Sequence, residues 1–240
     1  MKTLFLFPTE AEAAMFRSAA PEAEVRISGA GAAETAVAVA KALKDGYKRL
    51  IMAGIAGTYD EALEAGAVVA VAEERMAGLP EAYAKSYTAA ELPKGLPAVT
   101  ANTVSRCGAD ADGAQIENME GAVFFAMCAA AGVRFAEIRS ISNKVGAPRN
   151  EWHTDTAIEN LTRILIDKYI NKGFMSKNKL ILYIAIAVIL IAAIALIVSK
   201  WKLWFTEVMT WVLVIAVSFL AGWLIGRFGG KKKKTTEPAK

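Results

Sequence analysis

Short apolar runs alternate with alanine-rich amphipathic stretches over residues 1–170. Short apolar runs bounded by turn residues are typical of buried strands, whereas apolar positions three and four residues apart favour helices. The predicted strands are Leu4–Phe7, Val25–Ile27, Leu50–Ala53, Ala67–Glu74, Val99–Thr103 and Phe135–Ser140. The predicted helices are Glu10–Ala20, Ala32–Leu43, Asn118–Ala131 and Thr154–Ile170. This alternation predicts an α/β domain, a three-layer sandwich around a central mixed, mostly parallel sheet.

Two glycine-rich segments follow predicted strands. Ser28-Gly-Ala-Gly31 precedes a predicted helix, and Gly54-Ile-Ala-Gly57 follows the third strand. We interpret both as tight turns, because small residues let a backbone approach a ligand at the strand ends of an α/β sheet. Residues 76–97 show little periodicity and hold three of the seven prolines, which predicts a loop region.

Two long apolar runs close the chain. Leu180–Val198 is uncharged throughout, and Val208–Ile225 is interrupted only by Thr210, Ser218 and Gly222. Either run alone could be a buried helix of a soluble protein. Each is long enough to cross the roughly 30 Å hydrocarbon layer, and tryptophans lie near their ends. We therefore predict two membrane-spanning helices, joined as a hairpin by Ser199–Glu207.

The basic residues around these runs predict their orientation. Lys172, Lys177 and Lys179 precede the first run, and Arg227 with Lys231–Lys234 follows the second. Positively charged flanks stay in the cytoplasm, so both ends of the hairpin and the globular domain are expected there. The predicted parts are a domain at 1–173, a basic linker at 174–179, the hairpin at 180–226 and a polybasic tail at 227–240. Met175-Ser-Lys resembles the start of an independent small membrane protein, which suggests a fusion.

Composition supports this division. The chain is 55% hydrophobic, but residues 1–173 carry mixed charges and residues 180–225 almost none. The net charge of +4 reflects lysines near one end, so we expect no nucleic-acid partner. Cys107 and Cys128 show neither metal-site nor disulfide spacing, which favours reduced thiols. His153 is the single histidine, so we expect it to be a structural or surface residue, and we expect no metal or other cofactor. The amino terminus shows no signal-peptide pattern.

Two polar groups in the predicted domain suit nucleoside recognition. Glu120 lies beside a predicted helix start, and a carboxylate can accept both the 2′- and 3′-hydroxyl hydrogens of a ribose. Asn143 follows a predicted strand; its amide nitrogen can donate to N7 or a 6-oxo group, and its oxygen can accept from a ring N–H. These groups match hypoxanthine better than adenine. A solvated glutamate and a turn asparagine are the plain alternatives.

Five blocks, in this order, resemble the purine nucleosidase and nucleoside phosphorylase superfamily over roughly residues 3–170. The blocks are Phe7-Pro-Thr-Glu-Ala-Glu12, Ser28-Gly-Ala-Gly31, Ala53-Gly-Ile-Ala-Gly57, Asn118-Met-Glu-Gly-Ala122 and Arg139-Ser-Ile-Ser-Asn143. Within that superfamily the likeness is nearest to futalosine hydrolases, which release hypoxanthine from futalosine for menaquinone biosynthesis. The resemblance implies a nucleoside phosphorylase-like fold and a homodimer.

The resemblance also implies roles for single residues. Glu12 matches the glutamate that activates water at the anomeric carbon, although a plain charge at a helix start is the alternative. Met119 and Glu120 match the pair that holds the ribose. Asn143 stands where adenine-releasing relatives carry an aspartate, and it joins Glu12 as a candidate catalytic residue. The remaining candidates for substrate binding are Ser28, Gly29, Gly54, Thr103 and Ser142.

The chain departs from the family in two loops. Residues 76–97 and 105–115 look shorter than their counterparts, and no residue is assigned to stack on the base. A phosphorylase start of the type Gly-Asp-Pro-x-Arg is missing, so hydrolysis is favoured over phosphorolysis. The alternatives are a methylthioadenosine/adenosylhomocysteine-type nucleosidase, a nucleoside phosphorylase, or an inactive membrane-anchored nucleoside-binding protein.

Overall fold

The computed structural model describes residues 2–171 and 177–228. The chain divides into two compact units, Met1–Phe174 and Met175–Lys240. Most of the predicted linker and of the polybasic tail lies outside the described residues.

The first unit contains one eight-stranded sheet. Its strand order is β2-β1-β3-β7-β6-β4-β5, and β8 pairs with both β3 and β4. The strands are β1 (Thr3–Phe7), β2 (Glu24–Ile27), β3 (Arg49–Thr58), β4 (Val68–Met76), β5 (Ser86–Thr88), β6 (Ala98–Thr103), β7 (Ile116–Asn118) and β8 (Arg134–Lys144).

The sheet is mixed, as predicted. Strand β1 pairs in parallel with β2 and β3, β3 with β8, β4 with β6, and β6 with β7. The antiparallel pairs are β3–β7, β4–β5 and β4–β8. Strands β3, β8, β4, β6 and β7 thus pair in a closed circuit. This closure places the carboxyl ends of β3 and β8 next to each other, with the short strand β7 beside the end of β3.

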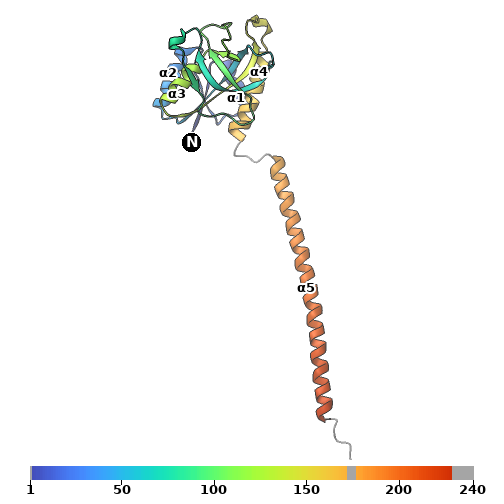
Figure 1. The fold of residues 1–240 in the computed structure, drawn as a ribbon. Helices are drawn as coiled ribbons and strands as arrows, with labels where there is room; N and C mark the ends of the chain where they lie inside the picture. The colour runs from blue at the N-terminus through green and yellow to red at the C-terminus, as the bar shows by residue number, and fades with distance from the viewer. Residues whose placement is uncertain (1, 172–176, 229–240) are drawn as a thin grey trace, which may run out of the picture. The chain divides into compact units, whose positions relative to one another are not determined.

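Helices cover both faces of this sheet, as the three-layer prediction requires. Figure 1 shows α2 (Ala32–Lys44) and α3 (Gly121–Ala130) on one face, and α1 (Glu10–Ala19) and α4 (Thr154–Leu165) on the other. Each face has its own apolar core. Val39 and Phe124 pack in the first core, whereas Phe16 and Leu161 pack in the second. Burial of such side chains supplies the main driving force for folding.

Several predicted boundaries differ from the structure. The segment 54–57 is not a turn, because β3 continues through both glycines, with a register shift at Ala56/Gly57. The short strand β5 lies inside the predicted loop 76–97. Strand β7 occupies the predicted start of the third helix, so α3 begins only at Gly121. After Leu165, a π-helical turn at Ile166–Ile170 continues α4.

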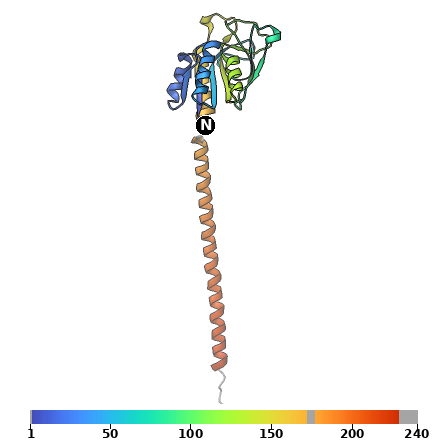
Figure 2. The same ribbon diagram turned by 90° about the vertical axis from the view of Figure 1, so that its left-hand side faces the viewer.

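The second unit corrects the predicted hairpin. Residues 177–228 form one continuous helix, α5 (Lys177–Phe228), which Figure 2 shows as an unbroken ribbon. The predicted connection Ser199–Glu207 contains no glycine or proline, so no residue in it ends a helix. The Leu182–Leu224 section of α5 is long and apolar enough to cross a membrane, and its side chains are not buried.

Candidate active site

One cleft collects most of the predicted site residues. It lies at the carboxyl ends of β3 and β8, next to β7 and the start of α1, and has a volume of about 210 Å³. Ligands of α/β sheets bind at such strand ends. The predicted residues that line it are Glu12, Met119, Glu120, Ser142 and Asn143.

Glu12 is held by two donors at the start of α1. Thr9 caps this helix, accepting at 3.3 Å from the Glu12 N–H, and its hydroxyl donates at 2.6 Å to Glu12 Oε2. The Ile55 N–H donates at 2.9 Å to Glu12 Oε1. The side chain is only 6% exposed. One donor on each oxygen fixes the orientation of the carboxylate, as a base that must orient water requires.

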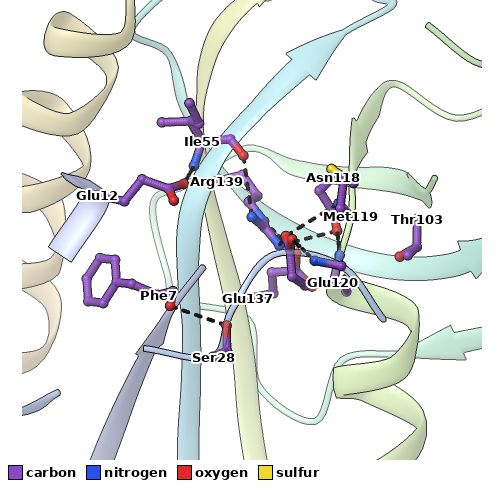
Figure 3. A network of polar contacts seen from close by, with 12 residues as sticks. Phe7, Glu12, Ser28, Ile55, Thr103, Asn118, Met119, Glu120, Glu137 and Arg139 are labelled. Carbon is purple, nitrogen blue, oxygen red and sulfur yellow. Dashed lines mark hydrogen bonds and ion pairs between the residues drawn. The ribbon is translucent and has the colours of Figure 1, made fainter. Parts of the chain in front are cut away.

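Glu120 is fixed from the opposite side of the cleft. Its Oε1 accepts from the Gly31 N–H at 2.9 Å, and its Oε2 accepts from Arg139 Nη2 at 3.0 Å (Figure 3). Both Glu120 and Arg139 are almost completely buried. Burial disfavours the charged form of Arg139, but Glu137 and Glu120 outweigh this effect and raise the pKa of the guanidinium. The arginine therefore stays charged and orients the Glu120 carboxylate.

Asn118 explains why Glu120 stands at the start of α3. The Asn118 Oδ1 accepts from the N–H groups of Glu120 at 2.9 Å and Gly121 at 2.8 Å, and from Arg139 Nη2 at 3.2 Å. The asparagine thus caps the first free N–H groups of the helix, which is the usual role of an amide or hydroxyl side chain there. This cap turns the chain from β7 into α3 and directs Glu120 into the cleft.

Asn143 ends the buried part of β8. Ser142 Oγ donates at 2.7 Å to Asn143 Oδ1 and lies 3.2 Å from the Ala56 carbonyl oxygen. The Asn143 Nδ2 donates to the Lys144 carbonyl at 2.8 Å. These contacts fix the orientation of the amide and leave one N–H and one oxygen lone pair for a ligand. Ser142 is therefore a support for Asn143.

The other predicted residues lie around the cleft without lining it. Ser28 Oγ is within 3.2 Å of the Phe7 and Gly29 carbonyl oxygens, and Gly29 has a φ of 81°. Gly54 makes room for its neighbours, because a Cβ there would lie 2.6 Å from Arg139 Nη1 and 2.9 Å from Glu12 Oε1. Thr103 lines an adjoining pocket and donates to Glu74 at 2.8 Å.

Several residues that line the cleft were not among the predicted site residues. Trp152 and Arg149 flank one side of the cleft, with the Arg149 guanidinium 4.3 Å from the Trp152 ring centroid. Val104 and Cys107 lie on the loop between β6 and β7, and burial raises the pKa of the Cys107 thiol. The sequence signal for Trp152 is a large aromatic residue in the polar segment between β8 and α4. In residues 2–171 and 177–228, no three His, Cys, Asp or Glu side chains gather as a metal site would require.

This arrangement combines a hydrogen-bonded carboxylate, a second carboxylate locked to an arginine, and an amide, in one cleft. The first can orient water, the second can accept ribose hydroxyls, and the third can bind a base edge. The Ile55 peptide connects the first two, because its N–H contacts Glu12 and its carbonyl accepts from Arg139 Nη1 at 3.4 Å. The apolar lining can hold the flat faces of a base.

Comparisons with known proteins find related sequences and related folds. Residues 100–171 match the model of the phosphorylase superfamily. A futalosine hydrolase of Thermus thermophilus is 48% identical over 52 residues, which is 21% of this chain and 23% of the relative. The matched segment thus spans less than a quarter of that relative's own length.

Solved structures extend the likeness to about two thirds of the chain. The 5′-methylthioadenosine/S-adenosylhomocysteine nucleosidase of Campylobacter jejuni aligns with a TM-score of 0.60 and 16% identity, covering 68% of this chain and 95% of its own. The native futalosine hydrolase of Helicobacter pylori aligns with a TM-score of 0.59 and 13% identity, covering 69% and 95%. At these identities the likeness shows that the domain has the nucleosidase fold.

Proposed function

We propose that the domain hydrolyses the N-glycosidic bond of a 6-oxopurine nucleoside, with futalosine as its substrate and hypoxanthine as the released base. The observation that carries this proposal is the convergence of Glu12, Glu120 and Asn143 on one cleft, each held by its own hydrogen bonds. The partial identity to a futalosine hydrolase supports the same substrate. A place in menaquinone biosynthesis follows from that substrate.

In the proposed reaction the ribose lies against Glu120 and the base against Asn143. Cleavage builds positive charge on the sugar ring while electrons flow into the base. Glu12 orients a water molecule and takes its proton as the oxygen attacks the anomeric carbon. The free N–H of Asn143 donates to N7 or the 6-oxo group, which stabilises charge arriving on the base. The fixed carboxylates need little reorganisation during this step.

Adenine-containing nucleosides are the second candidate substrate class. The structural likeness to methylthioadenosine/adenosylhomocysteine nucleosidases favours them. Asn143 argues for the 6-oxopurine, because its amide cannot protonate N7 as a carboxylic acid can. Measuring base release from futalosine, inosine and methylthioadenosine in parallel separates the two classes. Faster release of adenine than of hypoxanthine would reverse the assignment.

Glu12→Gln tests the catalytic step. The amide keeps the size of the side chain but cannot take a proton, so we expect hypoxanthine release by the full-length protein to fall at least about 100-fold. Chromatographic assay of the free base gives the rate. Glu10→Gln is the matched control, because Glu10 lies on the same helix but pairs with Arg17 at the surface. Unchanged turnover in Glu12→Gln would refute this mechanism, and tight nucleoside binding without turnover in the wild type would favour a sensor.

We further propose that α5 attaches this domain to a membrane, with the domain on the cytoplasmic side. The support is the 43-residue apolar section Leu182–Leu224 of α5. The product of the proposed reaction would feed a lipid-soluble quinone, which gives the attachment a purpose. By resemblance to the superfamily, we also propose that the domain forms a homodimer.

A further inference from the structure

Two carboxyl groups outside the cleft lie together beneath the start of α3. Glu74 comes from β4 and Glu137 from β8, and both side chains are fully buried. A Cβ on Gly121 would collide with the Glu74 carboxyl group and would lie 2.6 Å from Glu137 Oε2. Both carboxyl groups therefore approach the same small space, the one that a side chain on Gly121 would occupy. Neither lines the proposed substrate cleft.

The hydrogen bonds differ between the two groups. Glu74 accepts from uncharged donors, with Thr103 Oγ1 at 2.8 Å on Oε2 and Asn118 Nδ2 on Oε1. Glu137 Oε1 accepts from the charged Arg139 Nε at 2.7 Å. Glu137 Oε2 has no hydrogen-bond partner among the residues that the structure describes. A buried acceptor without a donor raises the free energy of the folded state. We therefore expect a hydrogen-bond donor next to this oxygen.

The balance of charges also indicates that one of the two carboxyl groups is protonated. Arg139 contacts the carboxylates of Glu120 and Glu137, so its single positive charge is already shared between two anions. A third carboxylate at Glu74 would add an uncompensated buried charge, which is far more costly than a protonated carboxyl group. Burial and the charge of Glu137 raise the pKa of Glu74 well above its usual range, although Asn118 and Thr103 lower it. Burial also raises the pKa of Glu137, against the effect of Arg139.

We propose that Glu74 and Glu137 hold one proton between them beside Gly121, and that this pair positions Arg139 and Asn118, which in turn fix Glu120. The proton lies on Glu74, since Glu137 faces the guanidinium, and the Glu74 O–H donates to Glu137 Oε2. Glu74 then holds Asn118, and Glu137 holds Arg139. When the chain folds at neutral pH, it takes up this proton from water, and one O–H bond forms on Glu74.

The sign of the pH effect follows from the raised pKa of Glu74. Below the pKa of the unfolded state, near 4.5, Glu74 is protonated in both states and the folded protein keeps its full stability. As the pH rises above that value, the unfolded chain loses the proton while the folded chain keeps it. Stability is therefore lost progressively with rising pH until the folded group also ionises.

The experiment compares unfolding of the full-length wild type and Glu74→Gln in detergent by chemical denaturation. Because glutamine carries no titrating proton, the ratio of the wild-type to the variant unfolding constant should rise by up to tenfold per pH unit between about pH 5.5 and pH 7.5. Glu73→Gln, half-buried on the same strand, is the matched control and should show a flat ratio. A flat ratio for Glu74→Gln would overturn the shared proton.

A measurement on the wild type covers the case in which the variant fails to fold. Infrared spectroscopy of the full-length protein at about pH 7.5 should show the carbonyl band of a buried carboxylic acid, because carboxyl groups at their usual pKa are ionised there. Loss of this band on unfolding at the same pH supports the proposal. Absence of the band from the folded protein contradicts it.

The positioning role rests on the proposed function and has its own test. In a Glu12→Gln background, which removes the proposed base, Glu137→Gln should weaken inosine binding at least about tenfold, because Arg139 then orients Glu120 without its second anion. Glu137→Asp, which keeps the charge, should recover part of that affinity. Unchanged binding in Glu137→Gln would remove the positioning role. If the Glu12→Gln protein binds no nucleoside at all, the proposed function fails, while the pH ratio still decides the shared proton.

Discussion

Asn143 is the residue on which the choice of base depends. Its amide is held by Ser142 and by the Lys144 carbonyl, so it presents a fixed donor and acceptor to the cleft. A carboxyl group at this position would offer a proton to N7 instead. The neighbouring hydrogen bonds leave the amide little freedom to exchange its two ends.

The substitution Asn143→Asp should therefore shift the preference towards adenine nucleosides. We expect the ratio of adenine to hypoxanthine release to rise at least about tenfold, since a mismatched buried hydrogen bond costs about 1–3 kcal/mol. Parallel assays with methylthioadenosine and futalosine measure this ratio. Asn150→Asp, at an exposed position beyond the cleft, serves as the control. An unchanged ratio would mean that Asn143 does not read the base.

Single residues differed in how well the sequence predicted them. Glu12, Glu120 and Asn143 occur in recognisable blocks, and the structure brings all three to one cleft. Glu74 and Glu137 could not be paired from the sequence. They come from strands that pair only over Val68–Ala70 and Ile138–Ser140, and they approach the same space at Gly121, where no side chain intervenes. Such long-range register leaves no local sequence pattern.

Strand β3 shows why the predicted element boundaries failed near the site. Glycine is unfavourable in a strand interior, so Gly54 and Gly57 suggested that the strand ends. The strand continues because β8 pairs with it through this whole segment. Only glycine fits at position 54 without displacing its neighbours, because Arg139 and Glu12 occupy the volume that a side chain would need.

Gly54→Ala should consequently damage both stability and activity. The added methyl group must displace Arg139 Nη1 or Glu12 Oε1, and overpacking of this kind costs about 1–3 kcal/mol of unfolding free energy. Denaturant unfolding and base-release assays on the full-length protein measure the two effects. Gly222→Ala in α5, where a Cβ meets no atom within 4 Å, is the control. Wild-type stability and turnover in Gly54→Ala would show that the site tolerates the methyl group.

The other elements were predicted to the extent that their periodicity is local. Helices α1, α2 and α4 begin close to their predicted starts, because Thr9 and acidic residues mark them in the sequence. Strand β7 was missed, since its three residues pair with β3 and β6 but form no pattern of their own. In α5 the prediction assumed a bilayer of finite thickness, whereas local propensity favours one continuous helix.

At the scale of the whole chain, we expect membrane association to depend on the second unit and base release on the first. Removing residues 174–240 deletes the apolar helix but leaves both cores of the first unit intact. We expect the full-length protein in the membrane fraction of disrupted cells, and the shortened chain in the supernatant with its base-release activity retained. Immunoblotting of both fractions after high-speed centrifugation measures this distribution. Full-length protein recovered in the supernatant would count against membrane attachment.

Helix α5 has 52 residues, which at 1.5 Å each gives a length of about 78 Å. Leucine, isoleucine, valine and tryptophan side chains lie exposed along it, with Trp201, Trp211 and Phe219 each more than two-thirds exposed. In aqueous buffer this apolar helix would cause copies of the chain to aggregate, because exposing so large an apolar surface to water is unfavourable. Purification of the intact protein without detergent should therefore lose material to aggregation.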